Sequence, residues 1–279
     1  MRKVAVITDS SACLPRDLVH RLGIQVLPIS VHLPGGELEL SEEEGEEGVV
    51  LPDGAEDEEL SAANRPFVTE YLAAIEGPGF ESAVVVTPAI EFAAMYRNAA
   101  LAAELAERPT VTIDARTAAA GQALVVLAGA EVAARGAPLE EVVRAVEDAA
   151  ARVELVASLA TLESIRRSGP IPDATLGEDG NGAERARTLF RMHGGEVELL
   201  GDPSGAEEAL RAMAAHVAAD RPGGVERVTV FHAGARELAD QLAALVGGVD
   251  FVSGFSLAMQ IHTGRGVVGV AWLPSASSA

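Results

Sequence analysis

A histidine and a threonine stand side by side near the end of the chain, where they could bind an anion. The segment Ile261-His262-Thr263-Gly264-Arg265-Gly266 leads into the apolar run Val267–Trp272. An imidazole N–H and a threonine hydroxyl can each donate a hydrogen bond to an oxyanion. The alternative is a histidine that makes a structural hydrogen bond at the start of a strand. Taken by themselves, the residue types favour that alternative.

A second polar group, Asp9-Ser10-Ser11, directly follows the apolar run Val4–Ile7. Open α/β sheets bind ligands outside the carboxyl ends of their strands, so Ser10 and Ser11 are predicted to hydrogen-bond a ligand. Capping of the helix that begins near Pro15 is an equally good role for these side chains. A nucleophilic serine with a histidine base is disfavoured, because the sequence contains no Gly-x-Ser-x-Gly turn.

Two further segments have features of anion or nucleotide sites. Thr87-Pro88-Ala89 precedes a predicted helix from Ile90 to Glu107, and the free N–H groups at such a helix start can bind a carboxylate. Glu91 in that first turn would repel the same anion or satisfy the helix dipole. Gly264-x-Gly266-x-x-Gly269 has the letters of a dinucleotide fingerprint, but a strand rather than a helix follows it. We therefore interpret it as a turn.

Composition argues against several classes of protein. Acidic residues number 42 against 21 Lys and Arg, a net charge of −21, which opposes binding to nucleic acid and electrostatic adsorption to anionic lipid. Cys13 is the single cysteine, and the six histidines lie on separate predicted elements without metal-ligand spacing. We predict no metal and no cofactor. The apolar runs are too short for a signal peptide or a spanning helix, so we expect a cytoplasmic protein without stable membrane insertion.

These candidate residues must be positioned by alternating strands and helices. Short apolar runs predict strands at 4–7, 24–29, 82–87 and 110–113, separated by helices at 15–22, 67–75, 90–107, 117–134 and 139–151. Such alternation is typical of a doubly wound α/β domain with a mostly parallel sheet. The first domain is therefore predicted to span residues 1–151.

From about residue 152 the pattern changes. Strands are predicted at 154–160, 188–193, 196–200, 225–232 and 267–272, with helices at 206–219 and 235–246. Gly194-Gly195 between two of these strands predicts a β-hairpin. The predicted fold class is thus α/β, with a second α/β domain over residues 152–279. The stretch from Gly35 to Leu60 is rich in Asp and Glu and has no basic residue, so we expect it to form a solvated loop.

Several of these segments together resemble the DegV family of bacterial fatty-acid-binding proteins. The strand that runs into Asp9-Ser10-Ser11 resembles the family's opening, and His262-Thr263-Gly264 its ending. Between them, Val26-Leu27-Pro28-Ile29-Ser30-Val31 resembles the second strand of the family. Its middle is matched by Tyr96-Arg97-Asn98-Ala99, Asp114-Ala115-Arg116-Thr117 and Phe231-His232-Ala233. The order and spacing of these motifs carry the resemblance, since each is of low specificity alone.

The resemblance implies two α/β domains that enclose a deep apolar ligand tunnel at the domain interface. A long-chain fatty acid would lie in it with its carboxylate at that interface, and many family members present the acyl chain to a fatty acid kinase. His262 matches the histidine that helps to hold the carboxylate, and Ser61 stands where the family has a contacting threonine. With the strand-end serines, the implied ligand-binding set is Ser10, Ser11, Ser61, Ala89, Ile90, Ala93, His262 and Thr263.

The chain departs from the family pattern around this headgroup site. The serine-rich loop of the family falls on Ala89–Met95, so its hydroxyls are absent and Glu91 has entered. The arginine of the family's Gly-Gly-Arg-Ile segment is replaced by Pro170. We therefore predict a non-enzymatic protein that binds a long-chain fatty acid. The alternatives are a divergent DegV-like protein that binds another lipid or apolar ligand, and, with less support, a hydrolase-like or nucleotide-using enzyme.

Overall fold

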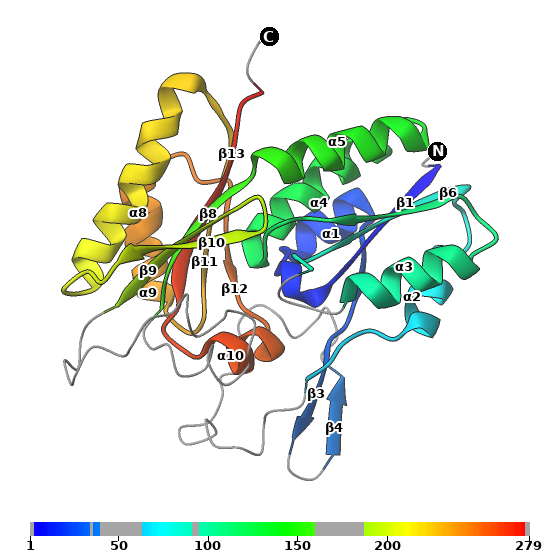
Figure 1. Cartoon of the computed structure of the whole chain (residues 1–279), viewed down its shortest axis with the longest axis horizontal. Coiled ribbons are helices and arrows are strands. Elements are labelled where there is room, and N and C mark those ends of the chain that lie inside the picture. Colours follow the sequence, from blue (N-terminus) through cyan, green and yellow to red (C-terminus); the bar gives the residue numbers. More distant parts are fainter. Residues whose placement is uncertain (1–2, 34–35, 40–62, 91–94, 160–186, 277–279) are drawn as a thin grey trace.

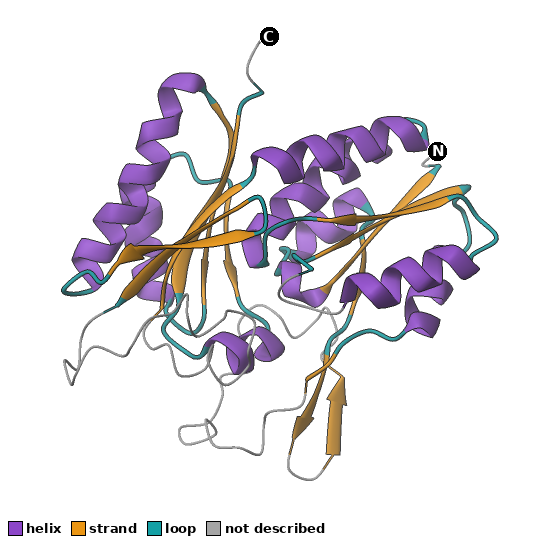
Figure 2. Ribbon diagram, viewed as in Figure 1, coloured by secondary structure: helices purple, strands orange, loops and turns teal. Residues whose placement is uncertain are grey.

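Two sheets, each covered by helices, make up the computed structural model of this chain (Figures 1 and 2). The structure describes residues 3–33, 36–39, 63–90, 95–159 and 187–276. The N-terminal sheet has the strand order β2-β1-β6-β7, and the second has the order β10-β9-β8-β13-β11-β12. A small sheet, β4-β3-β5, extends from the N-terminal half. The α/β fold class with a parallel sheet is confirmed.

The N-terminal sheet is parallel throughout its described strands. It consists of β1 (Val4–Asp9), β2 (Gln25–Leu27), β6 (Ser82–Thr87) and β7 (Thr110–Asp114). All residues of β1 and β6 are buried, as expected for central parallel strands. The chain places β2 on one side of β1 and then β6 on the other side, so the switch point of the sheet lies between β1 and β6. Open α/β sheets bind ligands at such a point.

Helices cover both faces of this sheet. On one face, α2 (Val68–Ile75) and α3 (Met95–Leu105) pack against alternate residues of β1 and β6 such as Ile7 and Val85. The other face packs against α1 (Arg16–Leu22), α4 (Ala119–Ala134) and α5 (Leu139–Arg152). The alternation of side chains along each buried strand thus supplies two apolar layers.

The second sheet is mixed and mainly antiparallel. It contains β8 (Glu154–Leu159), β9 (Thr188–His193), β10 (Glu196–Gly201), β11 (Val225–His232), β12 (Phe251–Gly254) and β13 (Val268–Pro274). β9 and β10 form the expected hairpin around Gly194 and Gly195, both at positive φ. One face is covered by α8 (Ala206–Asp220) and α9 (Arg236–Val246), and the other faces α4.

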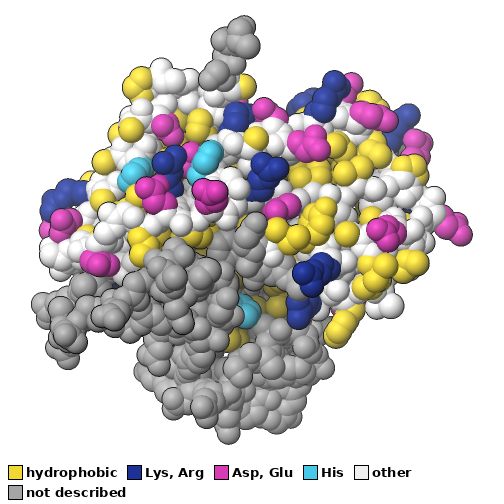
Figure 3. Space-filling model, viewed as in Figure 1, with side chains coloured by type: hydrophobic (Ala, Val, Ile, Leu, Met, Phe, Trp, Pro, Cys, Tyr) yellow, Lys and Arg dark blue, Asp and Glu magenta, His cyan; other side chains and the backbone are white. Residues whose placement is uncertain are grey.

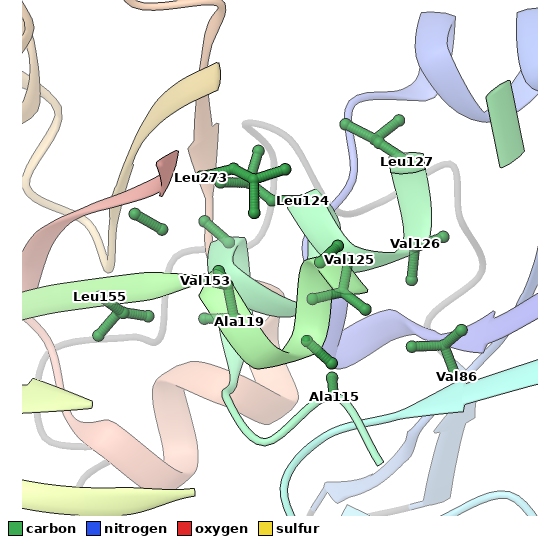
Figure 4. Close-up of a cluster of buried hydrophobic side chains, with 14 of the residues drawn as sticks. Val86, Ala115, Ala119, Leu124, Val125, Val126, Leu127, Val153, Leu155 and Leu273 are labelled. Carbon is green, nitrogen blue, oxygen red and sulfur yellow. The ribbon is translucent and has the colours of Figure 1, made fainter. Parts of the chain in front are cut away.

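Helix α4 is buried between the two sheets and joins their cores. Twelve of its sixteen residues are buried, and its side chains belong to one cluster with Val86 of β6 and Leu155 and Leu273 of the second sheet (Figure 4). A helix that is apolar on all sides is expected in this central position. The proposed boundary between residues 151 and 152 falls where α5 ends, and the cluster continues across it. The division into two domains stays a prediction.

Several elements differ from the sequence predictions. The expected acidic loop includes a described strand, β4 (Gly36–Glu39), which pairs with β3 (Ser30–Leu33). β3 also pairs with β5 (Ala63–Asn64), while residues 40–62 lie outside the described part. The alternative in which His262 stands at the start of a strand is wrong, because that residue lies in helix α10 (Leu257–Thr263), whereas the strand predicted at 267–272 is present as β13. Neither α10 nor β12 was predicted. Ser256 caps the short helix by accepting from the Met259 N–H.

On the face shown in Figure 3, acidic and basic side chains are interspersed with apolar ones across the described surface. None of the described helices combines the length and apolar character needed to cross a bilayer.

The contact between α4 and α5 predicts that Gly129→Ala lowers the free energy of unfolding. A Cβ at Gly129 would lie 2.4 Å from Val146 Cγ2. Overpacking costs about 1–3 kcal/mol, which exceeds the gain in helix propensity of about 1 kcal/mol or less. Urea unfolding of both proteins measures the difference.

Gly205→Ala is the matched control, since nothing lies within 4 Å of the corresponding Cβ. Equal or higher stability of Gly129→Ala would show that α4 and α5 can separate without loss.

Candidate functional site

The turn after β1 meets the segment before α10, which brings the two predicted polar groups into one region. Ser10–Ala12 form a short 3₁₀ helix (η1), followed by Cys13 at φ 52°. The Cys13 sulfur donates to the Ser11 carbonyl at 3.4 Å, and burial raises the pKa of this thiol to about 12, an effect that the nearby Ser256 backbone partly offsets. Phe255 belongs to the apolar cluster that α4 forms with both sheets. Cys13 and Met259 of α10 pack against that cluster. The carboxyl end of β1 and the start of α10 are therefore neighbours (Figure 1).

A fully buried polar network lies at the end of β1. Asp9 and Gln122 have no exposed surface. Ser11 donates to Asp9 Oδ1 from its N–H at 3.0 Å and also from its hydroxyl. Gln122 Nε2 donates to Thr8 Oγ1 at 3.0 Å and lies 3.4 Å from Asp9 Oδ2, while Thr8 Oγ1 donates to the Val86 carbonyl at 2.9 Å. These bonds tie β1, β6 and α4 together at the switch point.

The environment of Asp9 opposes its ionisation. Burial raises the pKa of its carboxyl to about 6, although hydrogen bonds from Ser11 and Gln122 partly offset this effect. The side-chain partners of Asp9 are Ser11 and Gln122 rather than a histidine. An Asp–His pair that could activate a serine is therefore not assembled here.

The two serines predicted to bind a ligand have different environments. Ser11 is buried, and its hydroxyl lies against Asp9 and Gln122, which gives it a structural role. Ser10 is half-buried, and its hydroxyl oxygen accepts from the Ile29 N–H at 3.0 Å. Because a hydroxyl can donate while it accepts, Ser10 keeps a donor that a ligand could use.

The loops after β6 and β7 carry buried hydroxyls and unusual backbone conformations. Ala89 is fully buried and its N–H donates to the Thr117 carbonyl at 2.8 Å, so it cannot bind a ligand through that group. Thr87 and Thr117 are fully buried, and their hydroxyls have no partner within the described structure. Arg116 and Ala119 have φ of 54° and 50°. Such strained, polar backbone is found disproportionately at binding sites.

Helix α10 supplies the predicted histidine–threonine pair, but only one member suits a ligand. Thr263 donates its hydroxyl to the Met259 carbonyl at 2.8 Å, which fixes it to its own helix. His262 is half-buried, and burial lowers the pKa of its imidazole. The neutral ring is therefore favoured, and it offers one N–H donor and one acceptor.

The structure leaves the other predicted site residues as predictions. Ile90 follows Ala89 but has 42% of its surface exposed. Ser61 and Ala93 lie outside the described residues. Among the residues that the structure describes, no group of three or more His, Cys, Asp or Glu side chains is placed to hold a metal ion.

One cationic residue near the site was missed by sequence reasoning. Arg187 precedes β9 and is half-buried, with its guanidinium bonded to the Gly266 carbonyl and to Ser158. Gly266 lies four residues after His262 on the loop into β13. No motif or spacing in the sequence distinguishes Arg187, because its position depends on how β8, β9 and β13 pair.

The buried Asp9 network predicts that Asp9→Asn is more stable than the parent at neutral pH. The folded pKa of about 6 lies above the ordinary value of 3.8, so the native state holds the proton more tightly. Its stabilising effect is complete below about pH 4 and is lost as the pH rises through about 6. The difference in unfolding free energy between variant and parent should grow across that range, by on the order of 3 kcal/mol.

Urea unfolding at several pH values between 4 and 8 measures this difference. A difference that stays constant with pH would contradict ionisation of Asp9 in this range.

Known proteins resemble this chain over nearly its whole length. The DegV family, described as uncharacterised proteins, matches residues 3–275. A DegV domain-containing protein of Streptomyces coelicolor is 30% identical over 281 residues, covering 96% of this chain and 98% of the relative. One from Mycobacterium bovis is 30% identical over 283 residues, covering 96% of each chain.

Solved structures share the fold. DegV from Bacillus subtilis, described as a fatty acid binding protein, is 19% identical and superposes with a TM-score of 0.83, covering 99% of this chain and 100% of its own. A DegV family protein from Thermus thermophilus, described by its fatty acid binding, is 23% identical with a TM-score of 0.81, covering 98% and 100%. The end-to-end match to the family and to relatives at 30% identity shows that this chain belongs to the DegV family.

Proposed function

We propose that this protein binds a long-chain fatty acid in an apolar tunnel at the interface of its two proposed domains. The observation that carries the proposal is the full-length match in fold to proteins described as fatty acid binding, including one from Eubacterium ventriosum described as binding stearic acid. Enclosure of an acyl chain is favourable because each buried methylene contributes about 0.8 kcal/mol. We place the boundary between the two proposed domains at residue 151.

The proposed carboxylate site lies where the turn after β1 meets α10. Ser10 and the neutral imidazole of His262 are the donors that support this placement, whereas Thr263 is held by the Met259 carbonyl. Ser61, Ala89, Ile90 and Ala93 complete the proposed ligand-binding set. Asp9 belongs to the buried network, where its carboxylate accepts from Ser11 and Gln122, so we assign it a structural role rather than contact with the ligand.

The proposed role is binding rather than catalysis. The bonding of Asp9 to Ser11 and Gln122 supports this view, since a hydrolase would need that carboxylate to orient a histidine. We extend the proposal to a cytoplasmic carrier that presents its acyl chain to a fatty acid kinase. Phosphoryl transfer depends on a precisely placed carboxylate. The missing hydroxyls of the loop at Ala89 would therefore affect transfer more than binding.

The first consequence is that the purified protein carries an acyl chain. Native mass spectrometry should show a mass above that of the polypeptide, and organic extraction should recover a long-chain fatty acid. Delipidated protein should then take up oleate. A protein that carries no lipid and does not take up a fluorescent fatty acid would contradict the proposal, and recovery of a neutral lipid would favour the divergent alternative.

The headgroup site predicts that His262→Ala weakens oleate binding by about tenfold or more, because a hydrogen bond to a charged group contributes about 1.5–3 kcal/mol. Ser61→Ala should have a smaller effect. Titration of delipidated protein with a fluorescent fatty acid measures both.

His20→Ala is the matched control, since His20 is exposed at the end of α1. If His262→Ala binds as tightly as the parent, the carboxylate lies elsewhere or the ligand has none.

A further inference from the structure

Arg187 fixes the loop that follows the proposed headgroup histidine. Its Nη1 and Nη2 atoms both lie 3.0 Å from the Gly266 carbonyl oxygen, and Nη1 lies 3.3 Å from Ser158 Oγ. The Gly266 N–H in turn donates to the Ala233 carbonyl at 2.7 Å. Two contacts of Gly266 therefore fix the segment between His262 and β13: the guanidinium of Arg187 and the carbonyl of Ala233.

The charge of Arg187 is not balanced by an acidic side chain in the described structure. Arg191, four residues further along β9, shows the usual arrangement: its Nε and Nη2 donate to the two oxygens of Glu154 at 2.8 and 2.7 Å. The partners of Arg187 among the described residues are instead neutral oxygens, and burial lowers its pKa. In a chain with twice as many acidic as basic residues, a half-buried cation without an acidic partner among the described residues is unusual.

The described bonds to Gly266 and Ser158 occupy only part of the guanidinium. A guanidinium has five N–H groups in a planar fork. Three contacts to two neutral oxygens account for the described bonds of Arg187, so its Nε–H and one Nη2–H have no acceptor among the residues that the structure describes. Those donors and the positive charge suit a carboxylate, which accepts from such a fork.

The pairing of the strands places Arg187 at the end of the second sheet where the chain enters α10. Leu159 at the end of β8 pairs with Thr188, the neighbour of Arg187. Val268 at the start of β13 pairs with Ser158 on one side and with His232 on the other. The Phe255 N–H donates to the His232 carbonyl at 2.8 Å, which brings the chain before α10 to the same end of the sheet. Arg187 and His262 therefore belong to the same end of the second sheet.

We propose that Arg187 is a positioning and specificity-determining residue for the carboxylate: it fixes the loop after His262 and supplies the positive charge that favours an ionised fatty acid over a neutral lipid. This inference rests on the proposed function. Because a charge acts beyond contact distance in a partly buried site, direct contact with the carboxylate is not required. The purely structural alternative is that Arg187 only fixes the loop.

Two ligands of equal chain length separate these roles. Oleate and oleyl alcohol differ in headgroup charge, so we would measure the Kd of each for the delipidated parent, Arg187→Gln and Arg187→Lys. Arg187→Gln should bind oleate about tenfold more weakly while its affinity for oleyl alcohol changes about twofold or less. Arg187→Lys, which keeps the charge, should retain most of the preference for oleate. Arg191→Gln is the control, since Arg191 is paired with Glu154.

An equal loss for both ligands in Arg187→Gln would overturn the inference in favour of the structural alternative, and no loss for oleate would overturn it outright. A parent that binds oleyl alcohol but not oleate would refute the inference and the proposed fatty acid ligand. A parent that binds neither would refute lipid binding altogether.

If Arg187→Gln does not fold, the unmodified protein still provides a test. Phenylglyoxal modifies arginine, and peptide mass spectrometry measures its rate at Arg187. Oleate should slow this modification more than oleyl alcohol does, and equal protection by the two ligands would overturn the inference.

Discussion

Burial of helix α4 between the two sheets is the constraint on which the rest of the structure depends. Its side chains contact the parallel sheet, the second sheet and α5, and most of its residues are buried as a result. Small residues permit this arrangement, as the approach of Val146 to Gly129 shows. Gln122 is the exception near the start of the helix, and its amide is used in full to join the network at the end of β1. The position of the helix therefore also positions the candidate site.

The site combines features that are costly for folding. Asp9 is buried with a raised pKa, Thr87 and Thr117 have buried hydroxyls without described partners, and Arg187 has no acidic partner in the described structure. Groups of this kind destabilise a protein unless something compensates for them. Their concentration around the strand ends of two sheets is what distinguishes this region from the well-paired surface, where arginines such as Arg191 bond carboxylates.

Much of the fold could be predicted from the sequence, because the elements with strong patterns are long or fully buried. The apolar run of β6 and the glycine turn between β9 and β10 lie where expected. α10 was missed because seven residues are too few for a clear period, and packing and the Ser256 cap stabilise it instead. The same limit applies to the site: the motif around His262 was visible, but the hydroxyl of Thr263 is used within its helix. Arg187 was missed because its position near the site depends on how β8, β9 and β13 pair, which the sequence pattern does not reveal.

The turn between β9 and β10 has a consequence for how the molecule comes apart. The Gly195 N–H donates to the carbonyl of Arg116, so the hairpin of the second sheet is tied to the loop that leads into α4. Together with the shared helix, this bond means that each half of the polypeptide completes part of its core with residues of the other half. Heating should therefore disrupt both sheets in a single cooperative transition, and a fragment cut after α5 would expose the apolar surface that the second sheet normally covers.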